Sequence, residues 1–275
     1  MQYELLDSGN LQKLEKFGDY LLVRPCSQAV WKPTAPQSLW ESASATFTRE
    51  EGNRWIYHKK LPKEWTTELA HVRFKIAPTD FGHLGIFPEH SYLWDFMRPH
   101  LEKRKGAKLL NLFAYSGGAS LVAASCGAHV CHLDASKGMV AWARENAALN
   151  NLQGAPIRWI IDDVSKFLAR EQKRGVRYDA IILDPPSFGR GNQGEIFKID
   201  RDLHNLLSSC TALLSDDPLF LILSTHTPGM TPLVMGHLLG QWMGKEGKIE
   251  TGEMCIHGKT LPLPCGSFAR WYRDV

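Results

Sequence analysis

From about residue 91 onward, short apolar runs alternate with longer amphipathic runs. Residues 108–114 form a nearly continuous apolar run of strand length, and residues 129–134 form the next one. Apolar residues recur at helical spacing over residues 118–126 and 136–150. Continuously apolar strands are typical of a parallel sheet that helices cover on both faces. The pattern therefore predicts a doubly wound α/β sheet, which binds ligands at the carboxyl ends of its strands.

The same alternation continues toward the C-terminus. The further strands expected are residues 157–161, 178–184 and 219–224, and the helices between them are residues 164–174 and 200–214. The last two strand-like runs, residues 252–256 and 267–273, have no helix between them. They predict an antiparallel hairpin that closes the sheet.

The first 84 residues have a different texture, with tryptophans and prolines between short extended runs. Residues 45–49 and 54–58 flank a polar turn and predict a hairpin. Residues 72–76 alternate with a period of two, and we expect residues 82–87 to run back beside them. The prediction is a small β-rich domain over residues 1–84, followed by a larger domain over residues 85–275. The tryptophans of the small domain either anchor its core or stack on nucleobases.

Composition narrows the class of protein. The chain has 275 residues, of which 44% are hydrophobic and 22% charged, as in a packed globular protein. No apolar run approaches the ~20 residues needed to cross a bilayer, and the N-terminus lacks the pattern of a signal peptide, so we expect a cytoplasmic protein with no membrane partner. The net charge of +3 is compatible with a polyanionic partner without requiring one. The six cysteines lack metal-ligand spacing, so no metal is expected, and no signal indicates an oligomeric state.

Two candidate ligand-binding features follow the first two strands of the predicted sheet. The turn over residues 114–118 ends in two glycines, which allow close approach of the backbone to a ligand at a helix N-terminus, although tight packing would also explain them. Asp134 ends the next strand, where a carboxylate can accept hydrogen bonds from both hydroxyls of a ribose. The alternative for Asp134 is an N-cap of the following helix.

Two further features follow the third and fourth strands. In Asp162-Asp163-Val164, an acidic side chain can accept from the amino group of adenine, with Asp163 preferred, or it can simply occupy a helix start. In Asp184-Pro185-Pro186, two prolines fix the backbone and remove two N–H donors, which leaves oxygen acceptors for a substrate.

These motifs carry a resemblance to a known family. Residues 111–120 (NLFAYSGGAS), residues 133–136 (LDAS) and Asp184-Pro185-Pro186 resemble class I S-adenosylmethionine-dependent methyltransferases. More narrowly, they are similar to the bacterial 23S rRNA methyltransferases of the cytosine-C5 and guanine-N7 type, without their PUA domain. The resemblance implies a Rossmann-like, seven-stranded, mostly parallel sheet with a C-terminal antiparallel hairpin, beside a small N-terminal β-rich domain. A nicotinamide enzyme fits less well, because no Gly-x-Gly-x-x-Gly follows the first strand.

The resemblance also implies roles for individual residues. The cofactor, S-adenosyl-L-methionine, would contact Phe87, Phe113, Ala114, Tyr115, Ser116, Gly117, Gly118, Asp134, Ala135, Ser136, Asp162, Asp163, Val164 and Asp184. Asp184, Pro185 and Pro186 would face the reacting acceptor. The substrate, expected to be RNA and specifically rRNA, would contact Ser187, Phe188, Arg190 and His226. Phe188 could stack on an extruded base or belong to the core, and Arg190 lies in a glycine-rich loop, residues 188–194, that we expect to be mobile.

One departure from the cytosine enzymes bears on the chemistry. Methylation of cytosine at carbon 5 needs a cysteine that adds to the neighbouring ring carbon. The fifth strand here ends in Ser224-Thr225-His226-Thr227, and Ser187 follows the prolines, so neither segment supplies a thiol. The sequence therefore favours a nitrogen or oxygen acceptor. A methyltransferase for a protein or small molecule, and a non-catalytic binding module, remain as alternatives.

Overall fold

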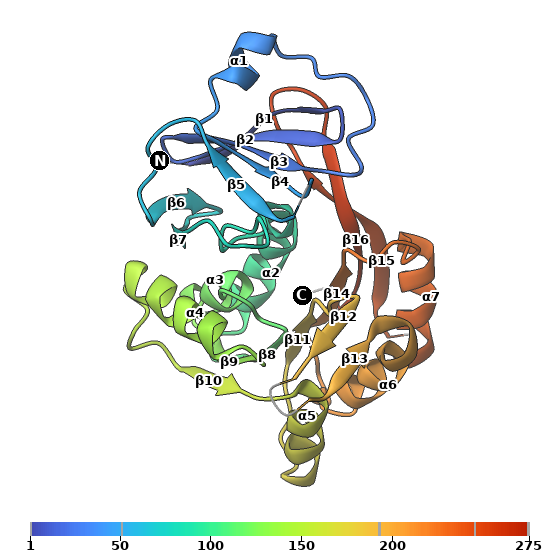
Figure 1. The fold of residues 1–275 in the computed structure, drawn as a ribbon. Helices are drawn as coiled ribbons and strands as arrows, with labels where there is room; N and C mark the ends of the chain where they lie inside the picture. The colour runs from blue at the N-terminus through green and yellow to red at the C-terminus, as the bar shows by residue number, and fades with distance from the viewer. Residues whose placement is uncertain (1, 51, 192–193, 245, 274–275) are drawn as a thin grey trace. The chain divides into compact units, whose positions relative to one another are not determined.

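The computed structural model describes residues 2–50, 52–191, 194–244 and 246–273 (Figure 1). The chain forms two compact units: unit 1 comprises Met1–Tyr92 and Cys255–Cys265, and unit 2 comprises Leu93–Met254 and Gly266–Val275. The domain boundary expected after residue 84 stays a prediction. Within the described residues, every helix is too short or too polar to span a bilayer.

Unit 2 is built on a seven-stranded sheet with the order β10-β9-β8-β11-β14-β16-β15. The strands are β8 (Lys108–Leu112), β9 (His129–Asp134), β10 (Ile157–Ile161), β11 (Ala180–Leu183), β14 (Phe220–Thr225), β15 (Lys248–Ile256) and β16 (Leu263–Tyr272). The first five strands of that order pair in parallel, and β16 runs antiparallel to β14. This confirms the predicted α/β fold, including a reversal of direction at the C-terminal end.

Helices cover both faces of this sheet. They are α2 (Ser91–Lys103), α3 (Gly118–Ser125), α4 (Lys137–Leu149), α5 (Val164–Lys173), α6 (Ile199–Thr211) and α7 (Pro232–Trp242). Apolar residues of α5, α6 and α7 form one buried cluster with β8, β9, β11 and β14, while α3 and α4 pack on β9 from the other face. Helices α2 and α7 were not expected from the sequence. Thr231 begins α7 as its N-cap, because its side chain accepts from the backbone N–H of Val234.

Unit 1 contains a five-stranded sheet with the order β1-β2-β3-β4-β5 and a separate two-stranded ribbon, β6-β7. The elements are β1 (Tyr3–Gly9), β2 (Gln12–Phe17), β3 (Tyr20–Pro25), α1 (Gln37–Glu41), β4 (Ala45–Thr48), β5 (Arg54–Tyr57), β6 (Trp65–Leu69), β7 (Val72–Ile76) and the 3-10 helix η1 (Pro88–His90). The predicted β4–β5 hairpin is confirmed, with Ala45 opposite Tyr57.

One strand expected in unit 1 is wrong. Residues 82–87 have bends at Gly82 and Gly85 and no strand, and β7 pairs with β6 instead. The physical reason is the backbone at Gly82 and Gly85, whose φ angles of 78° and 94° are incompatible with an extended strand.

The four tryptophans of unit 1 are anchored by hydrogen bonds. The indole N–H groups of Trp31, Trp55 and Trp65 donate to backbone carbonyls at 2.9 Å, and that of Trp40 donates to the Asp7 carboxylate at 3.1 Å. Buried indoles normally find such partners. These bonds support the anchoring role that the sequence left open, and an anchored ring can also present a face to a nucleobase.

Candidate active site

The segments singled out in the sequence of unit 2 follow neighbouring strands at one edge of the sheet. Leu112, at the end of β8, pairs with Leu183 of β11 and Leu133 of β9, and Asp134 pairs with Ile161 of β10. Because these strands are parallel, the residues that follow them all emerge at the carboxyl edge (Figure 1). The structure therefore brings the turn 113–118, Asp134, Asp162 and Asp184 to the same edge.

The turn between β8 and α3 is conformationally strained. Phe113, Tyr115 and Gly117 have φ angles of 55°, 49° and 95°, in the left-handed region that residues with side chains rarely adopt. The turn is held by backbone hydrogen bonds from Ala114 N to Leu133 O and from Gly117 N to Ala114 O, both 3.0 Å. Alternation of left-handed residues along a turn directs successive N–H groups toward a concave site.

The two glycines of this turn serve different purposes. Gly117 is the N-cap of α3 in a left-handed conformation and offers no side-chain acceptor to the first amides of that helix. A Cβ on Gly118 would lie 2.3 Å from the ring of Trp94 in α2. Close packing therefore explains Gly118, as the alternative reading of the sequence held, while backbone conformation explains Gly117.

Asp134 ties the end of β9 to this turn. Its carboxylate accepts from the backbone N–H of Tyr115 at 2.9 Å and from that of Ser136 at 2.8 Å. Burial raises the pKa of the Asp134 carboxyl above its ordinary value, and the two amide hydrogen bonds act in the opposite direction. Ser136 is the N-cap of α4, accepting from Met139 N at 3.3 Å, so the N-cap alternative for Asp134 is wrong. Ala135 between them is half-buried.

A buried polar network that the sequence analysis missed lies beneath the turn. Asn111 of β8 donates to the Ser120 hydroxyl at 2.9 Å, and that hydroxyl contacts Nδ1 of His132 at 2.9 Å. Asn146 of α4 donates to the carbonyl of Ser116, whose side chain is buried. Burial lowers the pKa of His132 to about 3, which keeps its imidazole neutral. The available signal was a polar residue inside each of two apolar strands, since Asn111 and His132 face each other in register.

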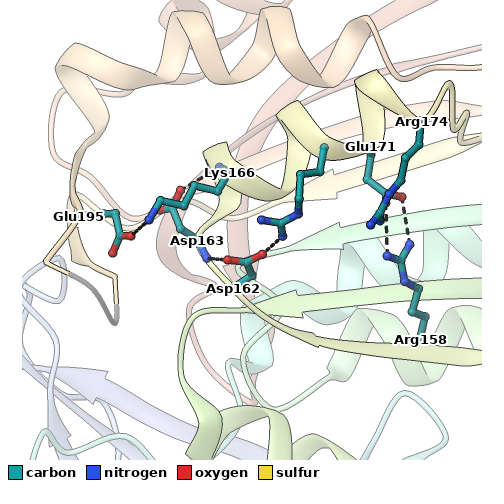
Figure 2. A network of polar contacts seen from close by, with 8 residues as sticks. Arg158, Asp162, Asp163, Lys166, Glu171, Arg174 and Glu195 are labelled. Atoms are coloured by element: carbon teal, nitrogen blue, oxygen red, sulfur yellow. Dashed lines mark hydrogen bonds and ion pairs between the residues drawn. The ribbon is translucent and has the colours of Figure 1, made fainter.

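The acidic pair after β10 begins a helix and joins ion pairs (Figure 2). Asp163 is the N-cap of α5 and accepts from Lys166 N at 3.0 Å. Asp162 accepts from Asp163 N and forms an ion pair with Arg170. Val164 points its side chain into the core of the unit. Asp163 thus has the helix-start role that the sequence left open, and its contact with adenine stays a prediction.

The exits of β11 and β14 are joined by side-chain hydrogen bonds. The Asp184 carboxylate accepts from the Ser224 hydroxyl at 2.8 Å, and Nδ1 of exposed His226 lies 3.9 Å from the same oxygen. The Ser187 hydroxyl contacts that of Thr227 at 2.7 Å. Of the two prolines between Asp184 and Ser187, Pro185 is buried and Pro186 is exposed. Ser224 and Thr227 were not identified as site residues from the sequence.

Residues 188–198 correct another expectation. The glycine-rich loop expected over residues 188–194 begins with a strand, β12 (Phe188–Arg190), which pairs with β13 (Ile196–Lys198). Asn192 and Gln193 lie outside the described residues. Phe188 is 50% exposed, so the core alternative for its ring is wrong, and the Arg190 guanidinium lies 5.8 Å from that ring.

Two contacts fix this hairpin against neighbouring elements of unit 2. The Phe197 ring lies 5.4 Å from that of Phe113 in the strained turn, and Glu195 forms an ion pair with Lys166 of α5 (Figure 2). The hairpin is therefore attached both to the turn after β8 and to the helix after β10.

Phe87, the remaining predicted cofactor residue, belongs to unit 1. It precedes η1, and its ring centroid lies 5.2 Å from that of His83. Its position near the cofactor stays a prediction.

The geometry agrees with the comparisons with known proteins. A sequence family described as S-adenosylmethionine-dependent methyltransferase matches residues 49–232. The chain belongs to this family. A SAM-dependent methyltransferase from Agrobacterium tumefaciens, solved by crystallography, is 39% identical, aligns over the whole of this chain and 91% of its own, and superposes with a TM-score of 0.95. The chain is thus a methyltransferase whose methyl donor is S-adenosylmethionine, as the sequence predicted.

More distant relatives extend the comparison. SMU.776, whose structure contains SAH (S-adenosylhomocysteine), is 20% identical in sequence to this chain. The alignment covers 98% of this chain and 75% of SMU.776, and the TM-score of 0.77 supports the fold. Among curated proteins, the "Ribosomal RNA large subunit methyltransferase K/L" of Shewanella baltica is 36% identical over 174 residues. That alignment covers 61% of this chain and only 24% of the relative, so the chain spans about a quarter of the length of the curated relative.

Proposed function

We propose that this methyltransferase acts on RNA, specifically rRNA, and transfers the methyl group to a nitrogen or oxygen atom. The observation that carries the proposal is the exit of β11, where Asp184 and the two prolines are followed directly by the exposed Phe188 ring and Arg190. An exposed ring beside a guanidinium suits a nucleobase and its phosphate. The name of the curated relatives supports the same substrate class.

Asp134 is the centre of the proposed cofactor site. Each of its oxygens accepts one backbone N–H, and a carboxylate oxygen has a second lone pair available for a ribose hydroxyl. Residues 113–118 would surround the methionine and sulfonium end, where the uncapped N-terminus of α3 can receive a carboxylate. Ala135 and Ser136 would line the adenosine, and Asp162, Asp163 and the backbone of Val164 would contact the adenine. Phe87 would pack near the cofactor.

The reaction requires alignment more than covalent help from the protein. The bound cofactor supplies a methyl group on a sulfonium, an electrophile with a good leaving group. The task of the chain is to hold the acceptor atom in line with the methyl carbon and sulfur. Asp184, held by Ser224, can accept an N–H or O–H of the acceptor, and the carbonyl of Pro185 can accept another. The rigid diproline exit keeps these acceptors in place.

The cysteines support a nitrogen or oxygen acceptor. Cys126, Cys131 and Cys210 are all buried, and burial raises the pKa of each thiol, to about 11 for Cys131. A thiol with a raised pKa is a poor nucleophile at neutral pH, because the thiolate is the reactive form. None of these three cysteines is therefore a suitable nucleophile for addition to the cytosine ring.

Nucleoside analysis tests the proposal. Purified chain and isotope-labelled S-adenosylmethionine are incubated with rRNA from cells that lack the protein, and the digested RNA is analysed by mass spectrometry. We expect a labelled nucleoside methylated on nitrogen or oxygen, and its loss in Asp184→Ala. RNA containing 5-fluorocytidine should form no covalent adduct with the chain. Label in a protein or small-molecule fraction, with none in RNA, would contradict the RNA assignment, and an adduct would contradict the chemistry.

A further inference from the structure

Unit 1 carries a pocket whose lining contains none of the residues of the candidate active site. Its volume is about 420 Å³, within the roughly 300–1,000 Å³ typical of ligand pockets. Its lining includes Trp40 and three residues with side-chain amides, Asn10, Gln12 and Gln37. Within the described residues none of these amides has a hydrogen-bond partner in the protein.

The wall that contains Trp40 is fixed in place. The buried carboxylate of Asp7 accepts hydrogen bonds from Thr34 N at 3.0 Å, Ala35 N at 2.8 Å and the Trp40 indole at 3.1 Å. Trp40 also packs on a small apolar cluster that includes Leu14. The ring is therefore held in one orientation while it lines the pocket, which reduces the entropy lost when a ligand stacks on it.

The chemistry of the lining selects the kind of ligand. Side-chain amides both donate and accept, and they pair with the edges of nucleobases. Glu41, also in the lining, can accept from the amino group of a base and would repel a phosphate. An aromatic wall with neutral amides and one carboxylate thus favours a flat, polar heterocycle over a free phosphate group.

The edge strand β5 lies beside this pocket and has the character of a nucleic-acid surface. Thr46 in the pocket wall pairs with Ile56, and its hydroxyl contacts Nε2 of His58 at 3.0 Å. Ile56 and Tyr57 are 41% and 57% exposed. Exposed Lys59 and Lys60 follow His58 in the chain. Aromatic and basic groups on one exposed edge suit a single-stranded backbone with stacked bases.

We propose that the pocket formed by Gln12, Gln37 and Trp40 binds one unstacked nucleobase of the RNA substrate, with β5 holding the adjoining strand. This inference rests on the proposed RNA substrate, and it assigns unit 1 a role in substrate binding. The base would stack on Trp40 and form hydrogen bonds with the amides.

Fluorescence anisotropy of the full chain with a 5′-fluorescein, mixed-sequence, single-stranded 12-mer RNA tests the inference at fixed salt. The double variant Gln12→Ala/Gln37→Ala should bind this RNA about tenfold more weakly, as expected for loss of hydrogen bonds to a base edge. The matched control Gln153→Ala, an exposed amide in unit 2, should bind like the wild type. SAH affinity should stay unchanged in both variants.

A second readout reports on the ring directly. In protein labelled with 5-fluorotryptophan, the ¹⁹F resonance of Trp40, assigned through Trp40→Phe, should shift on addition of the 12-mer and shift less in Gln12→Ala/Gln37→Ala. Wild-type affinity of the double variant, or an unmoved Trp40 resonance at saturating RNA, would overturn the pocket assignment alone. A wild-type chain that does not bind the RNA would overturn the RNA substrate as well.

Discussion

Replacing Asp134 by Asn tests the proposed contact with the ribose. A control substitution then separates the loss of that contact from a general loss of folding stability. The substitution keeps the size of the side chain and exchanges one carboxylate oxygen for an NH₂ group. One of the two amides that Asp134 now accepts from, Tyr115 N at 2.9 Å or Ser136 N at 2.8 Å, then faces a donor. In the proposed complex, one ribose hydroxyl loses its acceptor in the same way.

The expected magnitudes follow from these contacts. An N–H left without an acceptor in a half-buried site costs about 1–3 kcal/mol of folding free energy. An unpaired ribose hydroxyl costs a similar ~1–3 kcal/mol of binding, which weakens SAH binding about 5- to 150-fold. The variant should therefore show both a lower melting temperature and a higher Kd for SAH.

Asp179 provides the matched control. Its carboxylate also accepts a backbone N–H, that of Lys108 at 2.8 Å, as well as the Ser215 hydroxyl at 2.9 Å, but it lies at the amino ends of β8 and β11. Asp179→Asn should destabilise the fold to a similar degree and leave the calorimetric Kd for SAH unchanged. If Asp134→Asn binds SAH as tightly as Asp179→Asn does, the adenosyl group does not lie on Asp134.

Three further predictions test the site and the fold. Because ribose binding needs the ionised carboxylate and the pKa of Asp134 is raised by burial, calorimetry should show SAH affinity falling as the pH falls through that pKa, and Asp134→Asn should lose this dependence. Gly118→Ala should lower the free energy of unfolding by about 1–3 kcal/mol in urea titrations, because the new Cβ meets Trp94. Gly138→Ala, whose Cβ has its nearest neighbour at 3.8 Å, should raise that free energy by about 0.5–1 kcal/mol. Equal effects of the two substitutions would contradict the packing argument. Burial acts to raise the pKa of the Asp7 carboxyl, but the hydrogen bonds that this carboxylate accepts outweigh burial, so the pKa lies below its ordinary value of 3.8. The ionised carboxylate therefore stabilises the fold above pH 3.8, and this stabilisation is lost as the pH falls through the lowered pKa. Asp7→Asn should flatten the acid dependence of stability in urea titrations, and an unchanged profile would contradict the assignment.

The sequence could predict on which edge of the sheet the candidate site lies, because this depends only on the direction of the strands. Once residues 108–114, 129–134 and 178–184 are recognised as parallel strands, Asp134 and Asp184 must emerge on the same side. The hydrophobic pattern is sufficient for that inference. It does not depend on where each strand ends to within one or two residues.

The polar contacts beneath the site depend on more than pattern. Asn111 and His132 meet Ser120 because β8 and β9 align in one particular register and α3 crosses them, and register is not encoded in either strand by itself. Asp163 has the same limitation. Its position after β10 suits adenine and helix capping equally well, and only the hydrogen bond from Lys166 N identifies the capping role.

Helix α7 was missed for a different reason. Its sequence contains Gly236 and Gly240, which have low helix propensity, although Pro232 at the first helical position suits a helix start. A Cβ on Gly236 would lie 2.8 Å from Thr251 of β15, so the glycine permits close approach of the helix to the sheet. Tertiary packing thus outweighs the low helix propensity of glycine here.

The strained turn links the fold of unit 2 to its chemistry. Phe113 and Tyr115 in left-handed conformations each cost of order 1–3 kcal/mol, and such strain persists only where neighbouring contacts determine the backbone. Three such contacts hold the turn: Asp134 accepts from Tyr115 N, Leu133 O accepts from Ala114 N, and Phe197 packs on Phe113. Strand β9 and the β12–β13 hairpin therefore help to hold the turn in its strained conformation. Loss of one of these contacts, such as the Asp134 acceptor, should therefore weaken the fold, and it should also weaken SAH binding because the turn lines the proposed cofactor site.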